Sequence, residues 1–162
     1  ARSRAARGWR LPVLALINFT FIGGLAMLLP QILGNGKGPA QLGFDNELTI
    51  GLAALLLVVK VLITTSSLRA GAEGGLLTPG LAIGALLAII LGGAWSLAWP
   101  GVPLGAFAII GAAAFLAASM SMPLTAIVLV AEFTRIDHDF LVPIILAVVG
   151  SACVSKLCQR ST

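Results

Sequence analysis

Several residue types are scarce or missing from this 162-residue sequence. It has no tyrosine, one histidine (His138) and two cysteines. Cys153 and Cys158 are five residues apart, so a helix would place their side chains on different faces. A lone histidine between two aspartates is weak evidence for a metal ligand. We therefore expect neither a disulfide nor a metal site, and no cofactor.

Charge is scarce as well. Only 10% of the residues are Asp, Glu, Lys or Arg, whereas 59% are hydrophobic. The mean hydropathy of +1.06 is typical of a chain that is surrounded by lipid. Acidic and metal-ligating side chains are too few and too scattered for an intramembrane protease, a metal enzyme or a cation channel. The sequence predicts an all-α integral membrane protein that is not an enzyme.

The positive charge is concentrated before the first apolar run, at Arg2, Arg4, Arg7 and Arg10. By the positive-inside rule, this cluster places the N-terminus in the cytoplasm, in a multi-pass protein of the plasma membrane, such as the bacterial inner membrane. The apolar run that follows is too long for the core of a cleavable signal peptide. Because a membrane segment follows directly, we do not favour nucleic-acid binding by this basic cluster.

Apolar runs predict six segments of uneven length, and the fourth and fifth are short. A helix needs about 20 residues to cross the roughly 30 Å hydrocarbon layer. Short segments must be buried in protein or line a wet cavity, because lipid cannot pair with their exposed backbone groups. We therefore expect tilted, uneven and partly re-entrant helices. The six segments are residues 11–33, 48–68, 79–99, 105–119, 123–134 and 140–157.

The connections between these segments are short. Glycine and proline predict turns at residues 34–39 and 100–103, and charged residues predict a polar corner at 135–139. The alanine-rich stretch 111–119 predicts a face on which helices pack closely. Trp95 and Trp99 stand one helical turn apart, as rings that anchor a helix at the lipid headgroups do.

The run Gly74, Gly75, Leu76, Leu77, Thr78, Pro79 opens a stretch without Asp, Glu, Lys or Arg that reaches Ala131. Paired glycines permit a tight turn, and proline fits the first turn of a helix. A helix therefore begins here, in apolar surroundings. Its first N–H groups lack partners and carry the positive end of the helix dipole, so they attract anions. Taken alone, the run also fits a simple turn between two packed helices.

Three charged residues have two interpretations each. Lys60, inside an apolar segment, must face protein or water or else extend to the membrane surface. Glu73 is a pore-mouth carboxylate or, as we favour, a solvated neighbour of Arg69. Glu132 is a buried proton relay or, as we favour, the partner of Arg135 in an ion pair. The hydroxyls of residues 64–67 line a pore or, by default, bond to carbonyls of the preceding turn.

Three patterns, in matching order and spacing, resemble the CLC family of chloride channels and chloride/proton antiporters. The most specific pattern includes residues 71–79, which resemble the family's G-x-F-x-P anion motif, with Leu77 in place of phenylalanine. Another pattern, at residues 117–134, resembles the family's A-P-L-T-x-I-V-L-V-x-E-x-T run. The patterns are the glycine-rich turn 34–38, Lys60 with residues 64–67 and 71–79, and residues 117–134.

The resemblance covers residues 11–157 and implies one half of an inverted-repeat fold. Residues 11–158 would form the C-terminal half of a CLC-type membrane domain, between a basic segment (1–10) and a short tail (159–162). The missing N-terminal half carries the family's gating and proton-transfer glutamates. A homodimer is implied, with residues 122–134 and 140–157 at its interface. The family commonly contacts the anion with a tyrosine on its final helix; this chain has none, so it stops before that helix or departs from the pattern.

The implied function is transport of chloride or a similar monovalent anion across the lipid. The N–H groups of Gly75, Leu76 and Leu77 would contact the anion, with Gly74, Thr78 and Pro79 shaping the turn. Partial charges suit transit, because a full charge in a low dielectric would trap the ion. Channel and antiporter are not distinguished. The alternative is a non-transporting membrane subunit or an inactive half-transporter fragment.

Overall fold

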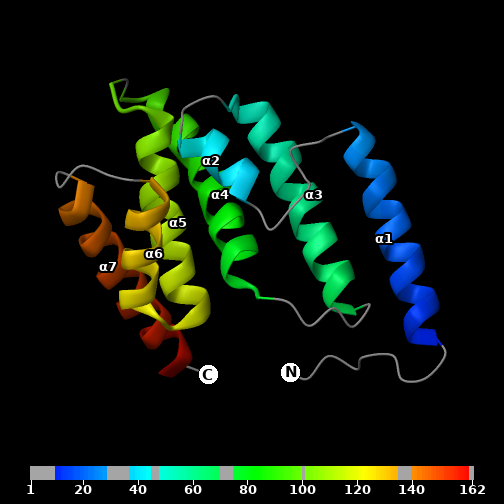
Figure 1. Cartoon of the computed structure of the whole chain (residues 1–162). Coiled ribbons are helices and arrows are strands. Elements are labelled where there is room, and N and C mark those ends of the chain that lie inside the picture. The colour runs from blue at the N-terminus through cyan, green and yellow to red at the C-terminus, as the bar shows by residue number, and fades with distance from the viewer. Residues whose placement is uncertain are drawn as a thin grey trace.

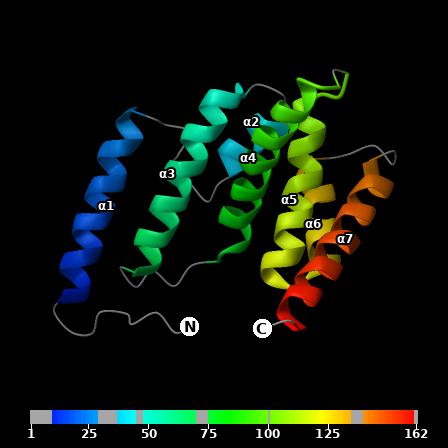
Figure 2. The ribbon, with the colours of Figure 1, turned by 180° about the vertical axis from the view of Figure 1, so that it is seen from behind.

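The structure, a computed structural model, describes residues 10–28, 37–44, 48–69, 75–99, 101–134 and 140–160. Within these ranges it contains seven α-helices and no strand. Five of the helices stand side by side in the order α1, α3, α4, α5, α7 (Figures 1 and 2). The helices are α1 (Arg10–Leu28), α2 (Lys37–Phe44), α3 (Ile50–Arg69), α4 (Leu77–Ser96), α5 (Leu104–Met120), α6 (Pro123–Thr134) and α7 (Leu141–Arg160).

The core lies where α4 packs on α5, and glycine makes this contact close. A Cβ added to Gly84 would lie 2.7 Å from the Cβ of Phe115 and 3.0 Å from the Cα of Ala112. Gly111 likewise leaves no room for a side chain beside Ala88. The stretch expected to pack closely is therefore confirmed as a helix–helix face, where small residues let two backbones approach each other.

Helix lengths are uneven, as the sequence predicts. The segments Ile50–Arg69, Leu77–Ser96 and Leu141–Cys158 are long and apolar enough to cross a membrane. At 17 and 12 residues, α5 and α6 extend only about 26 and 18 Å at the usual helical rise. The short α6 packs against α5 and α7, so neighbouring protein covers part of its backbone.

The prediction of six segments missed α2. Lys37, Gly38 and Pro39, which the sequence assigned to a turn, begin this eight-residue helix. Two glycines and a proline disfavour a short helix on its own, but packing against α4 and α5 compensates. Ala40 is 1% exposed, and a Cβ on Gly43 would lie 2.9 Å from the Cδ1 of Ile89. Tertiary contacts therefore override the local preference.

The helix expected from Pro79 to Trp99 runs instead from Leu77 to Ser96. Beyond its end the N–H groups of Ala98 and Trp99 both donate to the carbonyl of Trp95, at 2.9 and 3.0 Å. This tight turn stacks the rings of Trp95 and Trp99, with centroids 6.0 Å apart. Both rings are exposed, as amphipathic rings at a membrane surface are.

The close contact of α4 with α5 makes Gly84 sensitive to a single methyl group. We expect Gly84→Ala to destabilise the protein by about 1–3 kcal/mol, the usual range for overpacking. Gly24→Ala on α1 is the matched control, because a Cβ there meets nothing within 4 Å. It should leave stability unchanged or raise it by up to about 1 kcal/mol through helix propensity. Thermal unfolding in detergent measures both, and equal effects of the two variants would contradict the packing.

Candidate functional site

The candidate anion site is the N-terminus of α4. Leu76 is the N-cap residue, with φ −83° and ψ −5°, and its carbonyl accepts the N–H of Gly80 at 2.9 Å. The N–H groups of Leu77 and Thr78 precede this first i→i−4 bond of the helix. Pro79 lies within the first turn and has no N–H. No acidic residue lies in that turn, so the positive end of the helix dipole is not offset there.

This helix end is accessible. Gly75 and Leu76 are exposed, Leu77 to Pro79 are half-buried, and a Cβ on Gly75 would meet nothing within 4 Å. Leu76 supplies no side-chain capping bond. A small ligand can therefore approach the main chain of the first turn directly. Residues 71–74 of the proposed motif, Glu73 and Gly74 among them, lie outside the described residues.

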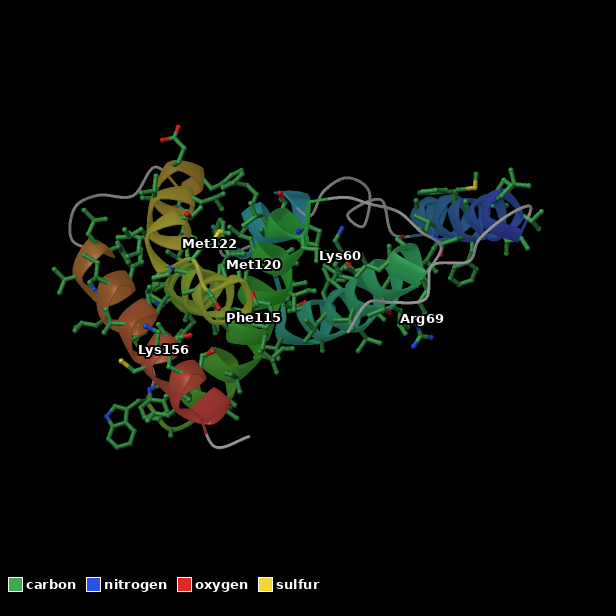
Figure 3. The ribbon with its side chains drawn as sticks, turned by 90° about the horizontal axis from the view of Figure 1, so that it is seen from below. Lys60, Arg69, Phe115, Met120, Met122 and Lys156 are labelled. Atoms are coloured by element: carbon green, nitrogen blue, oxygen red, sulfur yellow. The ribbon has the colours of Figure 1, made fainter. Side chains whose placement is uncertain are left out.

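Lys60 is enclosed by protein. It lies in the middle of α3 with only 4% of its surface exposed. Arg69, nine residues further on, is exposed, and Figure 3 shows the two side chains projecting from opposite sides of α3. The helical repeat places them so, because nine residues make two and a half turns. Of the two interpretations of Lys60, burial within the chain agrees with the structure, and extension to the membrane surface does not.

The hydroxyl run at the end of α3 is occupied with local bonds. Thr64 and Thr65 donate to the carbonyls of Lys60 and Val61, both at 2.8 Å, and Ser66 donates to that of Ile63 at 3.0 Å. The default interpretation is therefore correct for these three. Ser67 differs, because its hydroxyl accepts a hydrogen bond from the side-chain amide of Asn18 at 3.2 Å.

Asn18 was missed by the sequence-based reasoning. It lies on α1, 49 residues before Ser67, and a single amide within an apolar run gives no indication of its partner. A polar residue inside a membrane segment nevertheless needs a hydrogen-bond partner, and a search for complementary polar residues in other segments could have paired the two. The bond joins α1 to α3.

The third motif forms the corner between α5 and α6. Ser121 adopts a left-handed conformation, with φ 55° and ψ 30°, and the carbonyl of Met122 accepts the N–H of Ala126 at 3.0 Å in the first turn of α6. Glu132, near the end of α6, is exposed and borders a groove of about 660 Å³. Arg135 lies outside the described residues, as does His138, so the ion pair with Glu132 stays a prediction.

Metal ligands are not grouped in the described part of the chain. No cluster of three or more His, Cys, Asp or Glu side chains occurs there. Cys153 and Cys158 are both exposed on α7. The N-terminus of α4 offers main-chain N–H groups and the positive end of a helix dipole, the groups with which helix ends attract anions.

Comparison with known proteins gives consistent matches. Residues 1–156 match the protein family described as voltage gated chloride channel. The chain is 35% identical over 141 residues to the H(+)/Cl(−) exchange transporter ClcA of Citrobacter koseri, and 34% identical over 137 residues to that of Cronobacter sakazakii. Each alignment covers 83% of this chain but only 30% or 29% of the relative. The chain thus spans less than a third of the length of these relatives.

The open space around Gly75 leads to a prediction about stability. Its φ is not positive, since Gly101 is the one glycine with positive φ in the described residues. We therefore expect Gly75→Ala to change the free energy of unfolding by less than about 0.5 kcal/mol. Gly80→Ala, whose Cβ would lie 3.3 Å from the Cδ1 of Leu116, should destabilise more. Chemical unfolding of the two variants makes the comparison, and a larger loss for Gly75→Ala would refute the open geometry.

Proposed function

The chain belongs to the voltage-gated chloride channel family, and from this we propose that it forms one half of a chloride pathway. It is an integral membrane protein, and its described residues include three helices long and apolar enough to span the bilayer. The observation that carries the proposal is the accessible N-terminus of α4, within the run that resembles the family's anion motif. The H(+)/Cl(−) exchange named for the relatives motivates chloride as the ion.

In this proposal the N–H groups of Gly75, Leu76 and Leu77 hold a partly dehydrated chloride ion. Gly75 permits close approach of the ion, because no Cβ stands in front of the main chain. The helix dipole adds about half a positive charge at this end. Such partial charges bind an anion weakly enough for it to leave, as conduction requires. Lys60 and Glu132 stay outside this contact and act as structural or pore-lining polar groups.

A second half of the pathway would come from the part of the relatives that this chain does not cover. Each relative is more than three times as long as its matched region. An N-terminal half, related to this one as an inverted repeat, would close the site from the other side and supply gating and proton-transfer groups. The single carboxylate in the described part of this chain, Glu132, is exposed. Proton coupling would therefore depend on residues elsewhere.

We propose that the N-terminus faces the cytoplasm of a bacterial cell and that the membrane is the inner membrane. The arginine cluster before α1 supports this orientation, and the relatives come from bacteria. The protein is proposed to be a transporter and not an enzyme. A membrane subunit without transport activity is the alternative.

The test uses a completed protein, in which this chain replaces the matching 141 residues of the Citrobacter koseri relative. Purified and placed in liposomes, it should move chloride faster than empty vesicles, as a chloride electrode records. Leu76→Pro should weaken chloride binding by about tenfold or more, because it removes one N–H bond to a charged ligand. Proline fits there, since Leu76 has φ −83° and follows a glycine.

Leu76→Ala is the matched control, because it shortens the side chain and keeps the N–H group. Calorimetric titration with chloride should find the affinity of Leu76→Ala within about threefold of the unmodified protein. Equal losses for the two variants would assign the effect to the side chain and refute the main-chain site. A well-folded completed protein without chloride flux would favour the non-transporting subunit.

We further propose a homodimer joined through α6 and α7. Their outer faces carry exposed apolar side chains, including Leu124 at 77%, Val128 at 68% and Leu146 at 69% exposure. Apolar side chains alone fit lipid equally well, so the family resemblance carries this step. α6 and α7 lie on the opposite side of the chain from α1 (Figures 1 and 2).

Cysteine cross-linking tests the dimer. In a completed protein without Cys153 and Cys158, Val128→Cys should give a covalent dimer with a short thiol cross-linker in native membranes. Leu62→Cys on α3, at 61% exposure comparable to Val128, should stay monomeric. The proposed interface is wrong if Val128→Cys stays monomeric while single-molecule photobleaching finds two copies, or if both cysteines cross-link equally.

A further inference from the structure

A groove between α1 and α3 lies at the edge of the chain farthest from α6 and α7 (Figures 1 and 2). Its volume is about 620 Å³, and almost all of its lining is apolar. Three of its lining residues are polar: Asn18 on α1, and Ser66 and Arg69 on α3. Neither the chloride site nor the dimer interface uses these residues.

The polar groups gather at one end of this groove. α1 and α3 are antiparallel, so the beginning of α1 and the end of α3 lie together, at the lower end in Figure 1. Arg69 is the last residue of α3, and Ser66 and Asn18 follow it inward. The remainder of the lining is apolar and consists of Ile17, Phe21, Leu25, Val59, Leu62 and Ile63. The lining is therefore positively charged at the end near Arg69, neutral and polar at Ser66 and Asn18, and apolar along the rest of the groove.

The length of the groove matches one leaflet of a bilayer. From Arg69 to Val59, at ten residues, α3 rises about 15 Å, which is half of the roughly 30 Å hydrocarbon layer. A lipid with its headgroup beside Arg69 and an acyl chain along Phe21 and Val59 would fill it. Ser66 and Asn18 are neutral and donate to Ile63 and Ser67, so Arg69 supplies the charge that selects an anionic headgroup.

We propose that this groove binds an anionic phospholipid, with the phosphate at Arg69 and an acyl chain between α1 and α3. Basic pockets between membrane helices bind acidic headgroups in this way. Charge favours this occupant, because the groove combines one cation with a long apolar floor. A peptide segment would need hydrogen-bond partners for its main chain along the whole groove, whereas the polar residues lie at one end. Inorganic phosphate would leave the apolar floor in water.

The test compares lipids bound to the completed protein. Native mass spectrometry after incorporation into bilayers of phosphatidylcholine and phosphatidylglycerol at 4:1 should find bound phosphatidylglycerol enriched about fivefold over the bilayer. Arg69→Gln should remove most of this enrichment. Lys156→Gln, its matched control, removes one exposed positive charge from the last part of α7, on the far side of the molecule (Figure 3). The enrichment should survive this change.

Two further measurements separate the occupants. Val59→Trp narrows the apolar part of the groove and should lower the number of bound lipids, whereas Leu91→Trp, at an exposed position of α4 away from the groove and the proposed dimer interface, should not. Millimolar inorganic phosphate should leave the enrichment unchanged. Equal loss of enrichment in Arg69→Gln and Lys156→Gln, competition by phosphate, or no effect of Val59→Trp would each overturn the proposal. In the last case, the remainder of the transporter fills the groove.

The lipid site stands independently of the chloride site. Leu76→Pro, designed to weaken chloride binding, should leave the lipid enrichment as it is. Arg69→Gln should leave the chloride affinity within about threefold. Failure of one proposal is therefore visible separately from failure of the other.

Discussion

The close contact of α4 with α5 forms the core against which α2, α3, α6 and α7 pack. Gly84 and Gly111 let the two backbones approach without intervening side chains, so the long helix that begins at Leu77 is fixed along its buried length. Its first turn is then held by the core instead of by a capping side chain. A binding site made of main-chain groups needs this kind of support, because it has no long side chain that can adjust to the ligand.

Polar groups along the chain divide into those that bond locally and those that join helices. The hydroxyls of Thr64, Thr65 and Ser66 donate hydrogen bonds to carbonyls of their own helix. Other bonds run between helices. Asn18 donates to Ser67 and so joins α1 to α3, and Ser151 donates to the carbonyl of Ala114 at 2.6 Å and so joins α7 to α5. In lipid, where apolar contact alone drives little association, such bonds help to fix which helices are neighbours.

The sequence predicted the class of fold, the start of α4 within two residues and the close-packing face of α5, because each depends on local composition. The apolar runs, Pro79 and the alanine-rich stretch carry this information themselves. It missed α2, whose glycines and proline disfavour a helix until Ala40 and Gly43 meet the core. It also missed the pairing of Asn18 with Ser67, since contacts between distant segments leave no local pattern. The proposed site residues come from the resemblance to a family, because a paired glycine and a proline alone fit a simple turn equally well.

Pro79 has a consequence for how this helix end responds to mutation. Because a proline occupies the first turn and glycine precedes it, the shape of the turn is set by backbone geometry, and the side chains of Leu76 and Leu77 have a minor part in it. Truncating the side chains of this turn one by one would therefore change transport little, even where the main chain of the turn is essential for it. Changes to the main chain, such as replacement of an amide by an ester, are the perturbations to which such a helix end is sensitive. The contribution of each residue in this region is therefore measured by altering its main-chain amide and not its side chain.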